Sequence, residues 1–346
     1  DFFSQLDFVG IIAAGLIQLG IPASQALLLA SDPVQNPLLA FQALQLLPQF
    51  VNFPNAVNDG KSKDNNTDYN LKFTYAFNDF ASIYGGVSTG FKASAWNISR
   101  DSRPTANEIA GLSAAGTPVG PNTTVGTRYA NPEKAEVLEL GAKIALPTGY
   151  LNIAIFDQEI EDFQTNTFVG TGFVLANAGS QSADGYEFDL VISPTENIDL
   201  AVSGLFIDPI YDSYVGAAPG DLSGTVPSNT PEDTISSTIT WNYNISGWDS
   251  FLRISHLYSS EAQLLENPVH QALIDAQGNG YRKQDTLNLT AGFEKENLSI
   301  TLWGKNINDD EFLTSAFIGV ADLSETTFFG YPNSFKSYGL TLNYSF

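Results

Sequence analysis

Apolar and polar side chains alternate along most of this chain, and this alternation restricts the fold more than any other feature. Toward the C-terminus every second residue is large and apolar, and the residues between are small or polar. The apolar set there is Tyr338, Leu340, Leu342, Tyr344 and Phe346. Successive side chains of a strand point to opposite faces, so the pattern predicts a strand with one apolar and one polar face. From residue 69 onward it recurs and predicts about eleven strands.

The connections between the predicted strands are alternately short and long. Turns of about two to five residues, such as 78–79, 147–149 and 246–247, join some pairs of strands. The long stretches are residues 92–133, 208–232, 259–284 and 306–335. Short turns at one end and long loops at the other are typical of outer-membrane barrels, and about ten residues per strand suffice to cross a bilayer at a tilt. The sequence has no apolar run of about 20 residues, which a transmembrane helix would need.

Composition favours the same class and argues against several functions. The 24 Phe and 14 Tyr suit a lipid-facing band with aromatic girdles. A net charge of -23 disfavours nucleic acid as a partner, because phosphate binding needs clustered Lys and Arg. The chain has no Cys, so it has no disulfide and no thiolate metal site. It also lacks a Gly-rich phosphate loop and zinc-ligand spacing, so we expect neither a cofactor nor a metal.

Enzymatic function has little support in the sequence. His256 and His270 are the only histidines. His256 shares the alternation of an apolar strand face, and His270 lies in a long connection. No local signature brings a serine, a histidine and an acid together, so we assign no catalytic residue.

Residues 1–50 differ from the rest of the chain in composition and in the spacing of their apolar residues. They are rich in Leu, Ala and Gln, contain no Lys or Arg, and are divided by Pro22, Pro33 and Pro48 into about three short helices. Their apolar face is expected to carry Phe8, Ile11, Ile12, Leu16, Leu27, Leu28, Leu29, Leu38, Leu39, Leu44 and Leu47. We expect residues 1–68 to form an extracellular loop segment. Protein should cover its apolar face, either the barrel's own loops or a surface partner protein. Insertion into the outer leaflet is disfavoured because such helices usually carry Lys or Arg.

The odd strand number predicts an incomplete wall. The first predicted strand and the last both run toward the short-turn end, whereas bacterial single-chain barrels have even strand numbers. An open sheet edge in lipid leaves unpaired amides, each costing several kcal/mol. We therefore expect residues 69–346 to be the C-terminal half of a barrel that a preceding part of the protein completes. The start at Asp1, with neither Met nor a signal peptide, agrees with that expectation.

Several short motifs, taken in their order along the chain, resemble the TonB-dependent receptor family. They are Gly-Phe-Lys at 90–92, Asn-Pro-Glu at 131–133, Glu-x-Gly-x-Lys at 139–143, Asn-Ala-Gly at 177–179, Gly-x-Glu at 185–187, Gly-Lys-Asn-Ile-Asn-Asp at 304–309 and the terminal Phe346. Each motif is short, but their order holds over most of the chain. The resemblance implies an all-β transmembrane antiparallel barrel of 22 strands, of which these would be about the last eleven.

The family resemblance also implies a function and a location. It implies active import of a scarce ligand, such as a siderophore, cobalamin or an oligosaccharide, across the bacterial outer membrane. The implied partners are outer-membrane lipid, the N-terminal half with its plug, and TonB through that half; the plug and the TonB box are not in residues 1–346. Two alternatives stay open at this point, a passive porin-like channel and a structural or adhesion barrel whose loops dock a partner protein.

Two groups of residues are candidates for functional roles. Aromatic and cationic residues in the predicted long loops could stack on a ligand or grip its carboxylates; they are Trp96, Arg100, Arg103, Arg128, Tyr129, Tyr211, Tyr214, Tyr281 and Arg282. The alternative is that they only close loop packing. The second group is expected to be architectural, because polar residues at strand ends cap turns and satisfy backbone groups. It comprises Asn131, Glu139, Gly141, Glu187, Asn306, Asp309 and Phe346, the last presented to the assembly machinery.

Overall fold

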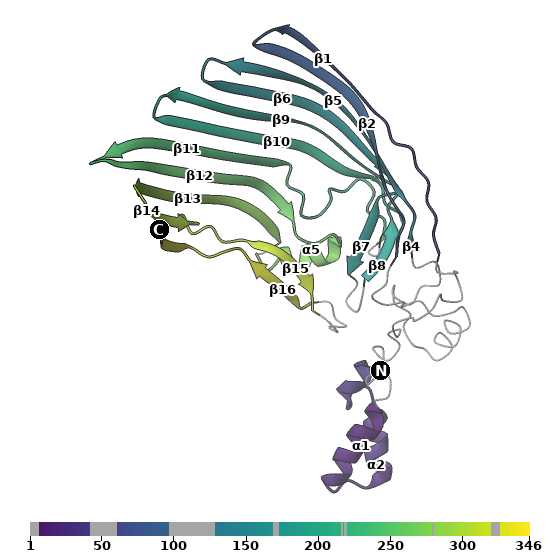
Figure 1. The fold of residues 1–346 in the computed structure, drawn as a ribbon. Coiled ribbons are helices and arrows are strands. Elements are labelled where there is room, and N and C mark those ends of the chain that lie inside the picture. The colour runs from purple at the N-terminus through teal and green to yellow at the C-terminus, as the bar shows by residue number, and fades with distance from the viewer. Residues whose placement is uncertain are drawn as a thin grey trace.

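Eleven strands form one antiparallel sheet in which neighbours in sequence are neighbours in space (Figure 1). The computed structural model describes residues 7–41, 61–96, 129–168, 173–215, 217, 220–278, 280–319 and 326–346. The strands of the sheet are β1 (Asn70–Asn78), β2 (Ala81–Lys92), β5 (Glu133–Leu146), β6 (Gly149–Glu161), β9 (Ser180–Thr195), β10 (Ile198–Ser213), β11 (Asp233–Ile245), β12 (Trp248–Gln263), β13 (Tyr281–Lys295), β14 (Leu298–Lys305) and β17 (Ser337–Tyr344). The predicted all-β antiparallel fold is confirmed.

The two ends of the sheet differ in the length of their connections, as the sequence predicts. One end carries only tight turns; at 246–247 both residues have positive φ, 55° and 80°, which suits a two-residue hairpin turn. The other end carries the long connections and the small elements inside them (Figure 1). These are β3 (Ala95–Trp96) with β4 (Tyr129–Ala130), β7 (Gln164–Phe168) with β8 (Phe173–Asn177), β15 (Leu313–Ile318) with β16 (Phe328–Pro332), and α5 (Pro268–Asp275).

Several strands extend farther toward the long-loop end than the alternation predicts. β10 continues to Ser213, β12 to Gln263, and β13 already begins at Tyr281. Parts of the predicted loops 208–232 and 259–284 are therefore strand, and Tyr211, Tyr281 and Arg282 lie in strands and not in loops. The alternation stops earlier because strand ends beyond the lipid carry polar residues on both faces, while the backbone pairing continues.

One face of the sheet is a continuous apolar band built by register. Leu302 is paired with Leu340 across β14 and β17, and Ile153 with Phe188 across β6 and β9. Leu340 and Leu342 are 57% and 62% exposed, as a lipid-facing position requires. The opposite face carries the polar set, such as Thr341 and Asn343 on β17. On β6, β9, β10 and β11, residues of this face line a cavity.

Carboxylates mark where the apolar band ends. Asp184 on β9 is paired directly with Asp157 on β6 and with Asp208 on β10. All three are exposed, and they share the outward face with Ile155, Tyr186 and Phe206. Like charges directly opposite each other repel, and only water and salt can screen them. The row therefore sets the loop-side limit of the lipid-facing band.

The N-terminal residues form a helical hairpin. It consists of α1 (Phe8–Gln18), α2 (Ala23–Ser31) and a 3-10 turn, η2 (Pro37–Phe41), which matches the expected three short helical segments. The side chain of Asp7 accepts a bond from Gly10 N at 2.8 Å and caps α1. The buried Asn36 amide donates to Phe8 O at 3.2 Å and to Ala30 O at 2.7 Å, which ties the two helices together. None of the helices in the described residues is long and apolar enough to cross a membrane.

The packing of this hairpin corrects one expectation. The large apolar residues were expected to share one covered face, but within the described residues the buried ones are mainly small: Ala13, Ala26 and Ala30, together with Phe8. Ile11, Leu27 and Leu28 are exposed instead. Small residues occupy the contact between the helices because they let two short helices approach closely. Leu44 and Leu47 lie outside the described residues.

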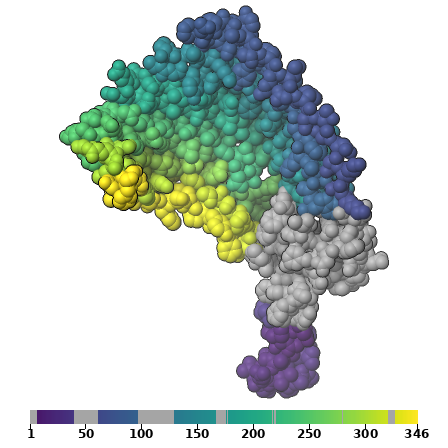
Figure 2. All heavy atoms as spheres, in the orientation of Figure 1, coloured from purple at the N-terminus to yellow at the C-terminus, as the bar shows by residue number. Residues whose placement is uncertain are grey.

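The sheet has two margins, β1 and β17. Figure 2 shows them as the blue and yellow borders of one curved wall of close-packed atoms. With eleven antiparallel strands, β1 and β17 run in the same direction, so they could not pair antiparallel with each other. The expectation that further strands complete the wall stays a prediction.

We expect a charge on the outward face to cost more than the same charge on the inward face. Leu340→Arg should destabilise the assembled full-length barrel by about 2–4 kcal/mol, the cost of Arg near the bilayer midplane on a lipid-facing position. Thr341→Arg, one residue along the same strand, is the matched control and should cost less. Urea unfolding in lipid vesicles measures both. Equal losses for the two variants would contradict the assignment of the faces.

Candidate functional site

The inner face of the wall is polar and hollowed. A cavity of about 270 Å³ lies against β6, β9, β10 and β11. Its polar lining consists of Tyr84, Asn152, Glu187, Asp189, Ser203, Thr234 and Ser236. Hydroxyls, an amide and two carboxylates can hydrogen-bond a hydrated or polyhydroxylated solute. Glu187, expected to be architectural, is part of this lining.

Glu139 and Gly141 help to hold an aromatic ring on this wall. Tyr84 on β2 lies directly opposite Gly141 on β5. A Cβ at position 141 would meet the Tyr84 ring at 2.4 Å, so only Gly lets the ring lie flat on the strand. The ring also receives the Lys143 ammonium at 5.5 Å from its centroid, and its hydroxyl bonds to Glu139. The Glu-x-Gly-x-Lys motif thus builds one packed unit.

The same three-part arrangement recurs twice on the inner face. Phe251 lies opposite Gly292 with Arg253 5.3 Å from its ring, and Trp303 lies opposite Gly339 with Lys305 5.4 Å from its ring. Covering glycine with a cross-strand ring stabilises a sheet at a position that lacks its own side chain. Each cation gains a cation–π contact. The wall therefore carries fixed rings and cations rather than a bare polar surface.

A hydrogen-bonded junction ties two loops together above β2 and β5. Asn131 N donates to Asn177 Oδ1 at 2.7 Å, and the Asn177 amide returns bonds to Asn131 O and Asp162 O. Gln164 donates to Asn131 O at 2.8 Å and, through its backbone, to Glu133 Oε2 at 2.9 Å. The Asn-Pro-Glu and Asn-Ala-Gly motifs meet here, with the contacts that an architectural role requires.

A second junction lies at the end of β14. Asn306 has a φ of 50° and is almost fully buried. Its amide donates to Asp310 O at 2.8 Å and to Ser334 O at 3.0 Å, and its Oδ1 accepts from Asp310 N. Asp309 also has a positive φ, 61°, and its exposed carboxylate lies 4.0 Å from Lys336 Nζ. Asn and Asp tolerate this left-handed backbone better than most residues, which explains their place in the motif.

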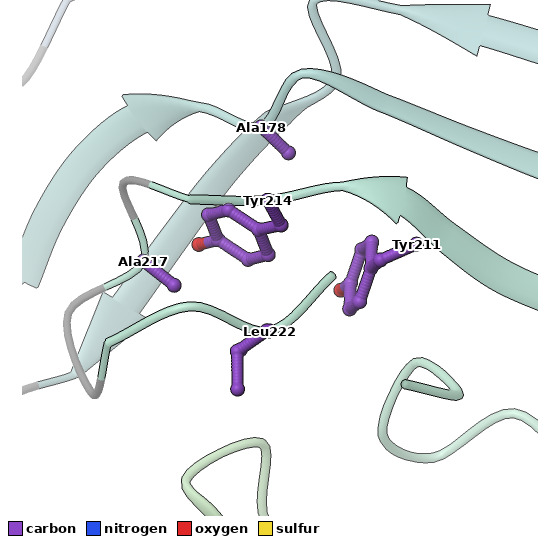
Figure 3. Close-up of a cluster of buried hydrophobic side chains, with 5 residues drawn as sticks. All are labelled: Ala178, Tyr211, Tyr214, Ala217 and Leu222. Carbon is purple, nitrogen blue, oxygen red and sulfur yellow. The ribbon is translucent and has the colours of Figure 1, made fainter. Parts of the chain in front are cut away.

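Tyr211 and Tyr214 are not exposed, contrary to the expectation for ligand-stacking residues. They are 5% and 1% exposed. Figure 3 shows the Tyr214 ring between Ala178 and Leu222, with the Tyr211 ring beside it, in a cluster that also includes Ala217. The ring centroids are 5.0 Å apart in an edge-to-face arrangement. Aromatic rings of this size bury well only when neighbouring loops fold over them. The sequence alone does not show which loops do so.

Tyr211 also connects two long connections. Its hydroxyl donates to Glu266 Oε1 at 2.7 Å, which joins the end of β10 to the connection between β12 and β13. Tyr211 lies beyond the carboxylate row and so outside the lipid-facing band. Burial first, and then the charge of Glu266, raise the pKa of the Tyr211 hydroxyl above its usual value. The hydroxyl therefore stays protonated and able to donate.

A second apolar cluster packs α5 against the β15–β16 hairpin. Leu264, Ile274 and Ala316 are buried in it. Gln271 on α5 is buried, accepts bonds from Leu264 N and Leu265 N, and donates to Gly280 O. Leu264 O in turn accepts from the Asn229 amide at 3.2 Å. The loops of β10–β11, β12–β13 and β14–β17 therefore form one packed layer above the wall.

The other candidate ligand-binding residues differ in their placement. Trp96 and Tyr129 stack on each other across β3 and β4 with centroids 5.0 Å apart, and Trp96 Nε1 donates to Ser62 Oγ. Arg282 has the inward parity of β13 and donates to Asn229 O at 3.2 Å. Tyr281 has the outward parity and is exposed. Arg100, Arg103 and Arg128 lie outside the described residues.

Sequence reasoning missed several residues that hold the loop layer. Gln164, Glu266 and Gln271 had no local signature, because their importance comes from partners distant in sequence. Asn177 could have been found, since it begins the Asn-Ala-Gly motif. The C-terminal Phe346 is fully exposed. Within the described ranges, no group of three or more His, Asp or Glu side chains has the arrangement of a metal site.

The amino-acid sequence matches one protein family over most of its length. The family is described as TonB dependent receptor-like, beta-barrel, and its profile matches residues 47–307. No curated protein sequence matches the chain.

Among the solved structures that share the fold are three receptors that are named for ferric ligands or a siderophore. The ferric yersiniabactin uptake receptor of Yersinia pestis shares 18% identity with a TM-score of 0.60, over 80% of this chain and 37% of that one. The ferric-catecholate import receptor of E. coli K12 shares 17% identity with a TM-score of 0.56, over 85% and 38% of the two chains. The siderophore receptor PiuA of Acinetobacter baumannii shares 16% identity with a TM-score of 0.54, over 80% and 35%. This chain thus spans little more than a third of each receptor, and at these identities the likeness concerns the fold.

We expect the bond between Tyr211 and Glu266 to stabilise the loop layer. Tyr211→Phe keeps the ring but removes the donor, which should cost about 1.5–3 kcal/mol, as for other bonds to a carboxylate. Tyr281→Phe, at an exposed position, is the control and should change little. Limited proteolysis of the loops in the full-length protein measures the effect. Equal cleavage rates in both variants and the wild type would contradict it.

The raised pKa of Tyr211 also predicts a pH dependence of the loop layer. Because the folded state favours the protonated hydroxyl, this contribution is present below about pH 10 and is lost as the pH rises further. Tyr211→Phe should remove that dependence. Proteolysis rates measured between pH 8 and 11 would test it, and a wild-type profile identical to that of the variant would count against it.

We expect Asn306 to act on stability and not on ligand binding. Asn306→Ala leaves Asp310 N and Ser334 O without the Asn306 side chain as their partner, which should cost about 1–3 kcal/mol. Asp310 O keeps its bond from the Asn333 amide. Asp309→Asn keeps a residue that tolerates positive φ and removes only a solvent-screened ion pair, so it should cost less than about 1 kcal/mol. Unfolding curves measure both, and ligand affinity of the folded fraction should be unchanged. A lowered affinity in a fully stable Asn306→Ala variant would instead indicate a binding role.

Proposed function

The chain belongs to the family of TonB-dependent receptor-like β-barrels, and from that premise we propose that it is the C-terminal part of a receptor that imports a scarce ligand actively. The family belongs to the bacterial outer membrane, and its members are receptors and transporters rather than enzymes. One observation carries the proposal: a wall with an outward apolar band and an inward polar face lies under a packed layer of loops.

The ligand we propose is a ferric siderophore. The structures of the same fold quoted above are named as receptors for ferric yersiniabactin, for a siderophore and for ferric catecholates, which makes ferric siderophores the first class to test. Cobalamin and oligosaccharides are the alternatives. The fixed rings and carboxylates of the inner wall and the inward Arg282 offer stacking, hydrogen bonding and one guanidinium to such a ligand.

The loop layer favours a gated receptor over a passive porin-like channel. Two apolar clusters and the Tyr211–Glu266 bond hold three loops together. An open water-filled channel does not need such a layer, whereas a receptor that captures a ligand from outside does. As part of this proposal, the ligand is contacted by residues of the loops that carry Trp96, Arg100, Arg103, Arg128 and Tyr129.

We further propose that the remaining strands and the plug come from a preceding part of the same protein, and that TonB acts through that part. The support is strand polarity. Because β1 and β17 run the same way, an odd number of further strands is needed to close an antiparallel wall, and a second copy of this eleven-stranded sheet would meet it with parallel edges.

Import by the full-length receptor should depend on energy. Cells expressing it under iron limitation should take up a ferric siderophore, and uptake should fall to the background level when a protonophore collapses the proton gradient or when TonB is deleted. Cobalamin and a maltooligosaccharide serve as the comparison solutes. Uptake that persists without the gradient would identify a passive channel, and energised uptake of only a comparison solute would replace the proposed ligand.

A further inference from the structure

The α1–α2 hairpin presents an apolar surface that nothing in the described residues covers. Leu28 is 76% exposed, and Ile11, Ile17, Leu19 and Leu27 are exposed as well. Between Phe8 and Ser31 there is no charged residue. Burial of such area is worth about 25 cal/mol per Å², so a surface of this kind is stabilised by an apolar partner.

The β15–β16 hairpin carries a second uncovered apolar surface. Its inner face packs on α5 through Ala316 and Phe328. Its outer face, which we call the aromatic face, consists of Phe317, Phe329 and Tyr331, all exposed, with Phe329 at 56%. Phe317 pairs with Phe329 in register, and the Phe317 and Tyr331 rings are 5.3 Å apart. Neither strand contains a charged residue.

The two surfaces belong to the same end of the wall and are within reach of each other. The α1–α2 hairpin precedes β1, which begins at the long-loop end, and β15–β16 connects β14 to β17 at that end. Eleven strands about 4.8 Å apart separate β1 from β17 by about 48 Å along the sheet, and by less in a straight line because the sheet is curved (Figure 1). Residues 42–60 can span about 63 Å when extended.

The chemistry of the hairpin favours protein over lipid as its cover. Membrane-surface helices usually carry Lys or Arg on their polar face, and residues 7–41 have neither. The aromatic face offers the hairpin a flat surface of uncharged rings, on which its aliphatic side chains can pack. Both surfaces lie in a chain of net charge -23, but neither carries a charge that would keep the two apart.

We propose that the α1–α2 hairpin docks through Leu27 and Leu28 on the aromatic face of the β15–β16 hairpin, as a strap across the loop end of the wall. Both surfaces are exposed in this structure, so the docked arrangement is a second one. The strap joins the β1 margin to the β17 margin at the end where ligand enters. It does not depend on which ligand the receptor carries.

Thiol labelling of the full-length receptor in intact cells tests the docking. The chain has no Cys, so Phe329→Cys gives a single thiol here once any cysteine in the preceding part is replaced. A membrane-impermeant maleimide should label it at least about tenfold faster when Leu27→Glu and Leu28→Glu are added, because tenfold protection corresponds to a docked population of about 90%. Ser24→Glu with Gln25→Glu adds the same charge at exposed positions of α2 and should leave the rate unchanged. Val215→Cys, in another loop, should react equally in all backgrounds.

A disulfide provides the second measurement. Leu28→Cys with Phe329→Cys should form a disulfide under mild oxidation, whereas Leu28→Cys with Val215→Cys should not. Labelling rates of Phe329→Cys that are identical in all three α2 backgrounds would overturn the proposal, including when a partner protein or lipid proves to shield Leu28. Protection relieved by the glutamate pair supports it even where the disulfide geometry is unfavourable.

Discussion

A backbone amide in lipid has no water to bond, so each strand of a membrane wall must pair with a neighbour on both sides. That constraint organises the whole sheet. It places consecutive strands side by side, because hairpins are the shortest way to supply partners, and it keeps the pairing continuous from β1 to β17. The register shifts that do occur lie near strand ends. Once the register is set, period-two alternation puts all outward residues in one band and all inward residues on one polar face.

The same register explains features that look unrelated in the sequence. Tyr84, Phe251 and Trp303 each lie opposite a glycine, because a glycine leaves room for the ring of its cross-strand neighbour. Asp157, Asp184 and Asp208 align because the three strands leave the lipid at the same height. Pairing continues past that row, and the strands there support the loop layer. The architecture of the site is thus an extension of the membrane wall.

The loop layer follows a different physical rule. Beyond the lipid, water can satisfy backbone groups, so order depends on side-chain packing and on buried hydrogen bonds. Tyr211 and Tyr214 supply apolar area in one cluster. Gln164, Gln271 and Asn306 satisfy backbone groups at three other junctions of the layer. Because these contacts join loops far apart in sequence, loss of one should loosen several loops together. A layer that moves as a unit suits a receptor that must admit a ligand and then close.

The sequence alone determined the strands, their faces and the end that carries long loops, because alternation and turn residues act over a few neighbours. It also indicated architectural roles for Asn131, Gly141 and Asn306, because each lies in a short motif that is recognisable in the sequence. It could not show that Tyr211 and Tyr214 are buried, or that Leu27 and Leu28 are exposed. Burial depends on which distant segment folds over a side chain. The partnership of Tyr211 with Glu266 joins residues on different connections, and only the tertiary structure decided it, since no periodicity records a contact between two loops.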